Sequence, residues 1–431
     1  MSDQGSVNAL DLLTERGFIA DVTDRDGLRD LFERERVTAY VGFDPTAASL
    51  HAGNLVGIMA LAWLQRAGHR PIALVGGATG RIGDPSFRDE ERALLPEDVI
   101  TGYVARIREQ LGRFLDLSGA DRGMLVDNYT WTADLRLLDF LRDVGKHFSV
   151  NQMIARESVK RRLESREQGI SYTEFSYQLL QAFDFSELYA TAGCRLQGGG
   201  TDQWGNIVAG VDLTRRLQGA EVFGVVWPLV EGSDGKKFSK TAGNAPMLDG
   251  ELTSPYAYYQ WWLNTDDRDI GRFLRLFTFL PLAEIDEIVA KHEDDPAARF
   301  GQRRLAEEAT RICHGDDALG GARRATAVLF GSERFEGLDD RTLEDAFEAA
   351  PSVDLPRSRL EEGIGLLELL VASGASSSNS DARRLVEQGG VRVNNVRVDD
   401  PKRVIGPDDL ASRSLLVLRV GRRRYHLARF T

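Results

Sequence analysis

Two short stretches, far apart in the chain, carry residue types suited to phosphate chemistry. His51-Ala52-Gly53-Asn54 stands where a helical pattern begins, and free backbone N–H groups and the helix dipole favour an anion at such a start. Lys236 to Thr241 supplies lysines that could neutralise charge on a leaving phosphate. No G-x-x-x-x-G-K-[ST] loop is present and no G-x-G-x-x-G opens the helix, so the usual phosphate-loop fingerprints do not apply.

The first stretch lies inside a strand–helix–strand pattern that spans residues 38–80. Thr38 to Phe43 is β-branched and aromatic, which indicates a strand, and Asp44-Pro45-Thr46 ends it. Apolar residues then recur at helical spacing, and Ile72 to Val75 predicts a second strand that ends in two glycines. Such a βαβ unit binds ligands at the carboxyl ends of its strands, although on this stretch alone a purely structural unit is an equal alternative.

The pair of stretches resembles the signatures of a known enzyme class. His51-Ala52-Gly53-Asn54 resembles the HIGH signature, and Lys237 to Thr241 the KMSKS signature, of class I aminoacyl-tRNA synthetases. The surrounding sequence is similar to the bacterial tyrosyl-tRNA synthetases over nearly the whole chain. The segments that carry this likeness are Tyr40 to Thr46, Val75 to Gly80, Gly83 to Ser86, Asp143 to Phe148, Phe175 to Tyr177 and Thr201 to Asn206.

The resemblance implies ATP-dependent activation of L-tyrosine to tyrosyl-adenylate, followed by transfer of the tyrosyl group to the 3′ end of tRNA(Tyr). ATP is expected as substrate, with Mg²⁺ as its partner rather than held in a protein cage. The chemistry needs two positioned reactants and neutralised phosphate charge. The expected catalytic residues are His51, Asn54, Thr46, Lys237 and Lys240. The expected ATP-binding residues are Gly42, Asp44, His51, Gly53, Asn54, Asp202, Lys237, Ser239, Lys240 and Thr241, with Arg88 and Arg92 in a loop near the same phosphates.

The resemblance also implies a tyrosine pocket with a polar end. Tyr40 and Asp184 would contact the phenol hydroxyl, so phenylalanine would leave two buried polar groups unpaired, at about 1–3 kcal/mol each. The α-amino group would be held by Asp84, Tyr177 and Gln181, and Gln203 is also expected to contact tyrosine. Asp184 could instead cap a helix start, but its spacing from Gln181 and Tyr177 favours one helix face.

One signature position departs from the family. Asn54 stands where the second histidine of the signature is usual. An amide N–H₂ donates hydrogen bonds at every pH and carries no charge, so we expect the role to survive with less pH dependence.

Composition describes an ordinary globular protein of two or three domains. The chain has 431 residues, of which 42% are apolar and 28% charged. There is no basic start followed by an apolar segment and no apolar run of membrane length, so we expect a cytoplasmic protein without a membrane segment. Cys194 and Cys313 lack metal-ligand spacing, which predicts reduced thiols and no zinc site.

The patterns predict an α/β fold with four consecutive regions. Residues 1–245 form a Rossmann-like parallel-sheet nucleotide-binding domain, with a helical insertion at about 130–190 that the resemblance implies is a homodimer interface; a helical lid on its own sheet is the alternative. Residues 246–331 are predicted to be all helical, and the resemblance implies that they form the anticodon-side domain. Its aromatic cluster from Tyr256 to Phe279 is more typical of a core than of a base-stacking surface. Residues 332–363 are expected to be an acidic linker, and 364–431 a small α+β RNA-binding domain.

Charge is unevenly distributed over the chain. The net charge is −12, yet residues 364–431 carry 12 basic and 7 acidic side chains, a local excess of +5. A basic tail module on an acidic body is typical of a nucleic-acid partner. Where the family commonly has basic residues, this chain has Ser376 to Ser380. The expected RNA contacts are therefore Arg383, Arg384, Arg392, Arg422, Arg423 and Arg424.

Two alternative functions remain open from the sequence. A synthetase-like RNA-binding protein without catalysis would be expected to lose signature residues, but Gly53, Lys237 and Lys240 are present. Activation of another amino acid, such as tryptophan, does not fit the presence of Tyr40 and Asp184, because an indole has no hydroxyl group to hydrogen-bond with them.

Overall fold

The computed structural model describes residues 7–86, 95–119, 121–156, 159–160, 163, 169–233, 235, 238, 245–330, 334–335, 337–421 and 424–431. The expected site residues Lys237, Ser239, Lys240, Thr241, Arg422 and Arg423 lie outside this set, as do Arg88 and Arg92. The chain divides into two compact units. The first comprises residues 1–252 with 264–313, and the second residues 253–263 with 314–431.

A six-stranded sheet in the order β1-β6-β5-β2-β3-β4 forms the centre of the first unit. Its strands are β1 (Asp21–Val22), β2 (Thr38–Phe43), β3 (Arg70–Val75), β4 (Met124–Asp127), β5 (Cys194–Gly200) and β6 (Phe223–Trp227). All neighbours from β6 to β4 pair in parallel, while β1 adds an antiparallel edge to β6. The predicted Rossmann-like architecture is confirmed, and the short β1 is an addition that no sequence pattern indicated.

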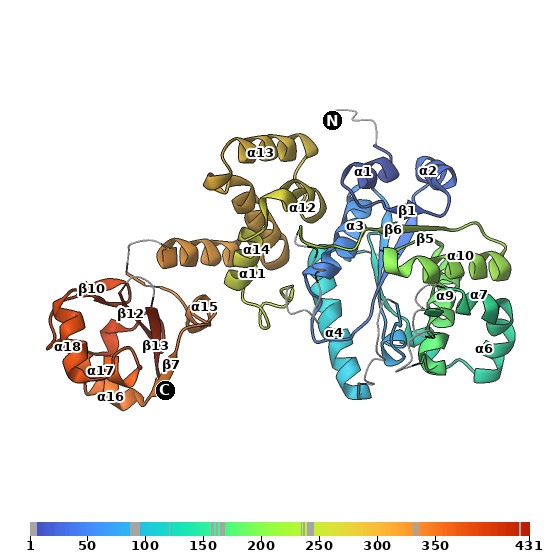
Figure 1. The fold of residues 1–431 in the computed structure, drawn as a ribbon. Coiled ribbons are helices and arrows are strands. Elements are labelled where there is room, and N and C mark those ends of the chain that lie inside the picture. Colours follow the sequence, from blue (N-terminus) through green and yellow to red (C-terminus); the bar gives the residue numbers. More distant parts are fainter. Residues whose placement is uncertain are drawn as a thin grey trace. The chain divides into compact units, whose positions relative to one another are not determined.

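Helices cover both faces of this sheet, as Figure 1 shows. They are α1 (Ala9–Glu15), α2 (Arg25–Arg34), α3 (Leu55–Arg66), α4 (Glu97–Phe114), α9 (Tyr172–Ala192) and α10 (Trp204–Gln218). Successive residues of a strand face opposite sides. Tyr40 therefore packs with Phe185 of α9, whereas Val41 faces α3, where a Cβ added to Gly57 would lie 3.2 Å from it.

The predicted helical insertion contains α5 (Tyr129–Thr132), α6 (Leu137–Asp143), the 3₁₀ turn η3 (Gly145–His147), α7 (Val150–Ile154) and the start of α9. Val144 is buried with Ala182 and Leu213, and Phe140 and Phe148 pack against the same cluster. These aromatic residues thus serve the unit's own core, while other apolar residues of the insertion face outward. The exposed ones include Leu137, Leu138, Leu141, Val150 and Ile154.

The region after residue 253 is helical, as predicted. Its helices are α11 (Pro255–Leu263), α12 (Ile270–Phe277), α13 (Leu282–Asp294) and α14 (Phe300–Phe330). Gly315 interrupts α14 with φ 85° and ψ 172°, next to the boundary between the two units. Most of the aromatic cluster is buried, including Tyr258, Trp262 and Phe273, so these side chains form cores rather than a stacking surface.

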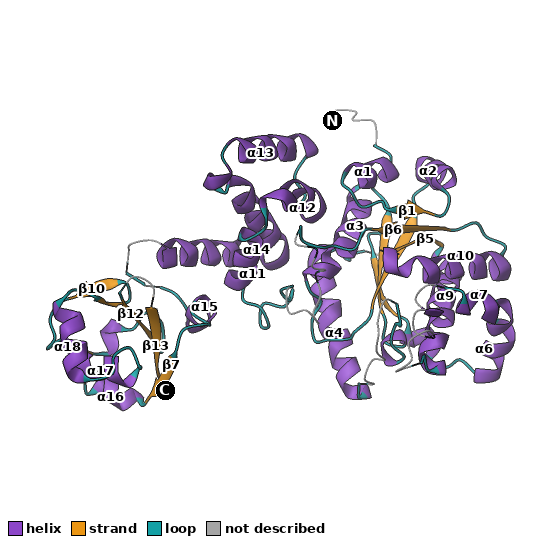
Figure 2. Ribbon diagram, in the orientation of Figure 1, coloured by secondary structure: helices purple, strands orange, loops and turns teal. Residues whose placement is uncertain are grey.

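The second unit contains a five-stranded sheet in the order β10-β9-β12-β13-β7, shown with its helices in Figure 2. Its helices and strands are α15 (Asp340–Ala346), β7 (Ser352–Leu355), α16 (Arg357–Glu361), α17 (Leu366–Ala372), α18 (Asn379–Glu387), β9 (Val391–Val393), β10 (Val396–Val398), β12 (Leu415–Val420) and β13 (Arg424–Phe430). The small strands β8 (Ile364–Gly365) and β11 (Val404–Ile405) pair with each other. A hairpin turn at Asn394 and Asn395, which have φ of 45° and 66°, joins β9 and β10.

The acidic linker predicted at residues 332–363 is wrong. Strand β7 pairs in parallel with β13, and Leu343 of α15 and Phe335 are buried against Leu415 and Val417 of β12. The opposite face of the sheet packs on α17 and α18. Composition misled here because the acidic residues of α15 surround a few apolar side chains that complete one face of the sheet.

Among the described residues, no helix combines the length and apolarity needed to cross a membrane.

Candidate active site

The parallel sheet changes its winding direction between β2 and β5. From β2 the chain adds β3 and β4 on one side, then returns to add β5 and β6 on the other. Ligands of open α/β sheets bind outside the carboxyl ends of the strands at such a switch point. The ends of β2 and β5 carry Tyr40, Gly42, Asp44, Thr46, Asp202 and Gln203, and α9 supplies Tyr177, Gln181 and Asp184.

Asp184 is a deeply buried carboxyl of α9. It is 2% exposed, and it accepts hydrogen bonds from Asn128 Nδ2 at 2.9 Å and Trp131 Nε1 at 2.8 Å. Burial raises its pKa from 3.8 to about 7, although both hydrogen bonds favour the ionised form. Asp184 lies inside α9 rather than at its start, where Ser171 provides the cap, so the helix-cap alternative is wrong.

The hydroxyl of Tyr40 is an unsatisfied polar group in this part of the sheet. The side chain is 1% exposed, and its hydroxyl has no hydrogen-bond partner among the described residues. Burial, and then the nearby charge of Asp184, raise the pKa of Tyr40 well above its usual value. A buried hydroxyl without a partner is costly, so a polar ligand group beside Asp184 would relieve it.

A chain of hydrogen bonds connects Asp184 to the end of β2. Asn128 Nδ2 also donates to Thr79 Oγ1 at 3.0 Å, and Thr79 in turn donates to Asp44 Oδ1 at 2.7 Å. The other oxygen of Asp44 accepts from the hydroxyl of Tyr177 at 2.8 Å. Asp44 was expected on the ATP side, but here it holds Tyr177, a residue expected at the tyrosine α-amino group.

A second polar cluster lies where β5 meets α10. Gln203 Nε2 donates to Asp84 Oδ2 at 2.7 Å, and Asn206 Nδ2 donates to Gln181 Oε1 at 3.0 Å and to Gln203 Oε1 at 3.3 Å. Three residues expected to bind tyrosine, Asp84, Gln181 and Gln203, are therefore brought into one network. Burial, and then the charges of Asp44 and Asp84, raise the pKa of Tyr177 well above its usual value. Two carboxylates near one hydroxyl suit a cationic ligand group.

His51 and Asn54 form a reciprocal cap at the start of the 3₁₀ turn η1 (Ala52–Asn54), which leads into α3. His51 Nδ1 accepts from the backbone N–H of Gly53 at 3.0 Å, so the proton of the neutral ring lies on Nε2. Asn54 Oδ1 accepts from the backbone N–H of His51 at 3.0 Å. Because its oxygen is used in the cap, Asn54 presents its N–H₂ group as a donor.

The two signature stretches approach each other at this cap. A Cβ added to Gly53 would lie 2.7 Å from the carbonyl oxygen of Phe238, the described residue of the lysine-rich stretch, so only glycine fits. Residues 246–248 also pair with residues 50–52, through Ala52 N to Pro246 O at 2.9 Å and Leu248 N to Leu50 O at 2.8 Å. The predicted proximity of the two signatures is thus supported by their described parts.

Gln110 of α4 supports the residues that precede His51. It is 2% exposed, and its Oε1 accepts from Leu50 N at 3.0 Å and Ser49 Oγ at 3.3 Å. Ser49 Oγ accepts in turn from the backbone N–H of Asp249 at 3.1 Å. The Nε2 group of Gln110 is buried without a partner among the described residues.

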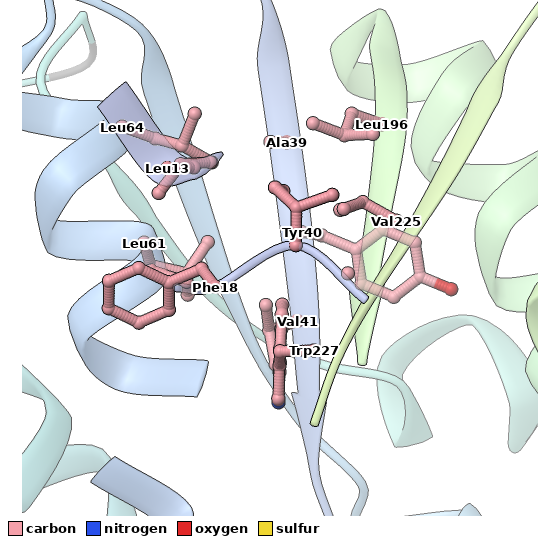
Figure 3. Close-up of a pocket in the computed structure, with 13 residues that line it drawn as sticks. Leu13, Phe18, Ala39, Tyr40, Val41, Leu61, Leu64, Leu196, Val225 and Trp227 are labelled. Atoms are coloured by element: carbon pink, nitrogen blue, oxygen red, sulfur yellow. The ribbon is translucent and has the colours of Figure 1, made fainter. Parts of the chain in front are cut away.

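A small apolar cavity lies on the other face of the sheet (Figure 3). Its volume is about 10 Å³, room for roughly one water molecule, and its lining includes Leu13, Phe18, Leu61 and Trp227. In Figure 3 the ring of Tyr40 points away from Phe18 and Leu61. The cavity is therefore a packing gap beneath α1 and α3, separate from the polar clusters.

Sequence reasoning missed several residues of the polar clusters, namely Thr79, Asn128, Trp131 and Asn206. Asn128 directly follows β4, and Thr79 follows β3, so their positions after parallel strands were a usable signal. Among the other predicted residues, Gly42 is exposed, and Thr46 and Asp202 are half-buried at the same strand ends. The described residues contain no cluster of three or more His, Cys, Asp or Glu side chains arranged for a metal ion.

The predicted RNA contacts of the second unit differ in their surroundings. Arg383 and Arg424 are exposed, whereas Arg384 pairs with Asp381 at 2.6 Å and Arg392 donates to the carbonyl of Asn395 at 2.9 Å. The serine-rich stretch has a local structural role. Ser378 caps α18, and Ser376 is buried and donates to Asp381.

Two family models match the chain. Residues 33–331 match the class I tRNA synthetases for tryptophan and tyrosine, and residues 342–428 match the C-terminal domain of SYY-like tyrosine–tRNA ligases. The tyrosine–tRNA ligase of Roseiflexus castenholzii is 50% identical over 422 residues, covering 97% of this chain and 99% of the relative. That of Geobacillus stearothermophilus is 47% identical over 428 residues, covering 98% and 100%.

Solved structures give the same picture for the fold. A C-terminally truncated mitochondrial tyrosyl-tRNA synthetase of Aspergillus nidulans aligns with a TM-score of 0.68 at 33% identity, over 75% of this chain and 94% of that one. The tyrosyl-tRNA synthetase of Archaeoglobus fulgidus, solved with L-tyrosine, aligns with a TM-score of 0.52 at 20% identity, over 73% and 98%. At that identity the second likeness concerns the fold alone.

Proposed function

The chain belongs to the tyrosyl-tRNA synthetases, a family of class I tRNA synthetases, and we propose that its tyrosine and ATP sites lie at the carboxyl ends of β2 and β5. As a tyrosine–tRNA ligase it activates tyrosine with ATP and transfers the tyrosyl group to tRNA. The alternative of an RNA-binding protein without catalysis is set aside by this membership. What we propose beyond it is the role of each residue.

The observation that carries the proposal is the buried, unpartnered hydroxyl of Tyr40 beside the carboxyl of Asp184. A substrate phenol can accept a hydrogen bond from Tyr40 and donate one to Asp184, which satisfies both groups at once. Phenylalanine offers neither hydrogen bond, so the Tyr40 hydroxyl would stay unpaired and Asp184 would keep only Asn128 and Trp131 as donors. Tyrosyl-tRNA synthetases are themselves the known example of an enzyme that rejects an analogue lacking a hydroxyl without an editing step.

The α-ammonium group of tyrosine would lie at the other polar cluster. Asp84 and Gln181 carry the acceptor oxygens, and Tyr177 is held in place by Asp44. The two ends of the substrate would then be fixed by groups spaced along α9, together with Tyr40 of β2 and Asp84, which restricts its orientation before reaction.

Activation requires the tyrosine carboxylate to attack the α-phosphate of ATP while pyrophosphate leaves. His51 Nε2–H and the Asn54 amide are donors at a helix start, and Thr46 adds a hydroxyl. Lys237 and Lys240 would neutralise the leaving pyrophosphate, with Ser239 and Thr241 beside them. Gly42, Gly53 and Asp202 would contact ATP, and Mg²⁺ would enter as the partner of ATP.

Tyr40→Phe tests the tyrosine pocket. The substitution removes one of the two groups that discriminate against phenylalanine, so the ratio of kcat/KM for tyrosine over phenylalanine should fall by roughly five- to a hundredfold. Pyrophosphate exchange with each amino acid measures this ratio. Tyr189→Phe is the matched control, because Tyr189 lies on α9 but packs at the rim of the apolar cluster. An unchanged ratio in Tyr40→Phe would remove Tyr40 from the pocket.

A homodimer through the helical insertion is the second part of the proposal. Leu137 is 70% and Leu138 78% exposed on α6, and Val150 is 56% exposed nearby along the chain. Exposed apolar side chains gathered on one insertion favour a protein interface. Leu138→Asp should shift full-length protein from dimer to monomer in sedimentation, whereas Phe148→Asp would disturb the unit's own core. A parent enzyme that sediments as a monomer would contradict this part.

The C-terminal module is proposed to hold tRNA(Tyr). Arg383 and Arg424 are exposed and available to phosphates, and Arg384, Arg392, Arg422 and Arg423 complete the set expected from the sequence. We place the whole reaction in the cytoplasm, where tRNA charging supplies protein synthesis.

A further inference from the structure

Three arginines stand directly opposite one another on adjacent strands of the five-stranded sheet. Arg397 of β10 pairs in register with Arg392 of β9, and Arg392 pairs with Arg419 of β12. Tyr425 of β13 lies opposite Arg419 and ends the row. Directly paired residues point to the same face of a sheet, so the three guanidinium side chains project from one face and lie next to one another. We call residues 392, 397 and 419 the arginine row.

The arginine row faces away from α17 and α18. Val391 and Val393, on either side of Arg392, belong to the core beneath those helices. Leu418 and Val420, on either side of Arg419, belong to the same core. Because alternate residues of a strand face opposite sides, the row lies on the other face. Arg383 and Arg384 are on α18, so the row is a different surface from theirs, and of the contacts expected from the sequence it contains Arg392.

The arginines of the row have no carboxylate partner among the described residues. Arg392 donates to the carbonyl of Asn395 at 2.9 Å, and Arg419 Nη1 contacts the hydroxyl of Tyr425 at 3.4 Å. The Nε group of Arg419 is buried and has no hydrogen-bond partner among the described residues. Other arginines of this module are paired: Arg384 with Asp381, Arg403 with Asp409, Arg429 with Glu344 and Arg359 with Glu368.

Like charges directly opposite each other destabilise a sheet, so a row of three guanidinium groups without carboxylates has no structural benefit on its own. An anion outside the chain would balance it. Neighbouring strands lie about 4.8 Å apart, so the row extends over roughly 10 Å, more than a single phosphate group covers. Successive phosphates of one nucleic-acid strand match such a line, and guanidinium groups bind phosphate through two parallel hydrogen bonds.

We infer that the arginine row is a phosphate-binding surface for the RNA backbone, and that Arg397 and Arg419 act in it together with Arg392. The inference rests on the proposed role of the C-terminal module in holding tRNA. It assigns the grip to the sheet face rather than to α18 alone, and it is independent of base sequence because the contacts are to phosphates.

The test uses full-length enzyme with Arg397→Gln and Arg419→Gln as separate variants. Arg403→Gln is the matched control, because Arg403 lies in the same module but its charge is balanced by Asp409 at 2.7 Å. Affinity for tRNA(Tyr) is measured over a series of salt concentrations. Each row variant should lower the slope of log affinity against log salt by about 0.7–0.9, and the control should leave it unchanged.

Two further readouts separate binding from folding. Pyrophosphate exchange should equal the parent rate in all variants, because the activation residues lie in the other unit. The melting temperature of the row variants should be equal to or above that of the parent at low salt, since a like-charge contact is removed. Arg397→Lys should restore the salt slope because it restores the charge.

Parent-like salt slopes in both row variants would overturn the inference, as would a slope loss of equal size in Arg403→Gln. Deletion of residues 332–431 distinguishes this failure from failure of the proposed function. If the deletion weakens tRNA binding and the row variants do not, only the arginine row is wrong. If the deletion also leaves tRNA affinity and its salt slope unchanged, the module does not hold tRNA.

Discussion

The two sheets of the molecule treat polar groups in opposite ways. At the carboxyl ends of the six-stranded sheet, Asp184, Asn128 and the hydroxyl of Tyr40 are buried, and the last has no partner among the described residues. In the five-stranded sheet the covered parts of both faces are apolar, and charged groups such as Arg383 and Arg397 lie outside.

This difference follows from the kinds of ligand. Selecting a small molecule by one hydroxyl requires buried polar groups in the site. Binding of the wrong molecule is then less favourable, because it leaves these groups without a hydrogen bond. Holding a polyanion requires several exposed cations, each of which contributes a little and depends on salt. Substitutions in each sheet can test the two sides of this contrast separately.

The largest effect is expected from the buried carboxyl. Burial raises the pKa of Asp184 from 3.8 to about 7, so the folded state resists an ionisation that the unfolded chain undergoes near 3.8. Stability present below about pH 4 is therefore lost as pH rises toward 7. Relative to Asp184→Asn, the parent should lose up to about 1.4 kcal/mol of unfolding free energy per pH unit in this window.

Urea unfolding of both proteins between about pH 4 and 8 measures this difference. Any constant offset from altered hydrogen bonds to Asn128 and Trp131 cancels in the slope. A difference that does not change with pH would mean that Asp184 ionises as an exposed carboxyl does.

The next largest effect is expected from deleting residues 332–431. The deletion begins at 332 rather than 364 because β7 and α15 belong to the same module. Pyrophosphate exchange should persist, while tRNA charging at physiological salt should fall by on the order of a hundredfold as phosphate contacts are lost. Charging at the parent rate by the truncated enzyme would contradict the division of labour between the two sheets.

The smallest effect is expected from Gln110→Met. The substitution leaves Leu50 N–H without its acceptor and removes the longer of the two contacts that Ser49 Oγ makes as a donor, and these residues precede His51. Loss of this support should slow tyrosyl-adenylate formation by about fivefold, corresponding to about 1 kcal/mol. Stability should change less, because the substitution also removes an Nε2 group that is buried without a partner among the described residues.

Gln65→Met is the matched control for Gln110→Met. Gln65 also uses its amide to hold backbone groups, those of Asp116 and Arg122, but it lies at the opposite end of α3 from His51. Equal slowing in both variants would show that Gln110 acts only through general stability.

Local pattern was enough for much of the first unit. The segment from Thr38 to Phe43, rich in β-branched and aromatic residues, is β2 at the predicted bounds. Residues of these types favour an extended backbone through local preference, so no distant contact was needed to predict the strand. The two signature stretches could be located because their chemistry requires particular residue types in order. The hairpin at Asn394 and Asn395 was predictable because few residues other than glycine and asparagine accept positive φ.

Only the tertiary structure decided which side chains share a site and which segments share a sheet. Thr79 and Asn128 are 49 residues apart, and their hydrogen bond exists because β3 and β4 end side by side. The acidic composition of residues 332–363 indicated a linker, yet β7 pairs with β13 because the apolar side chains that matter are few and non-periodic. Arg392, Arg397 and Arg419 likewise form a row through strand register, since pairing between strands depends on contacts that no local sequence pattern contains.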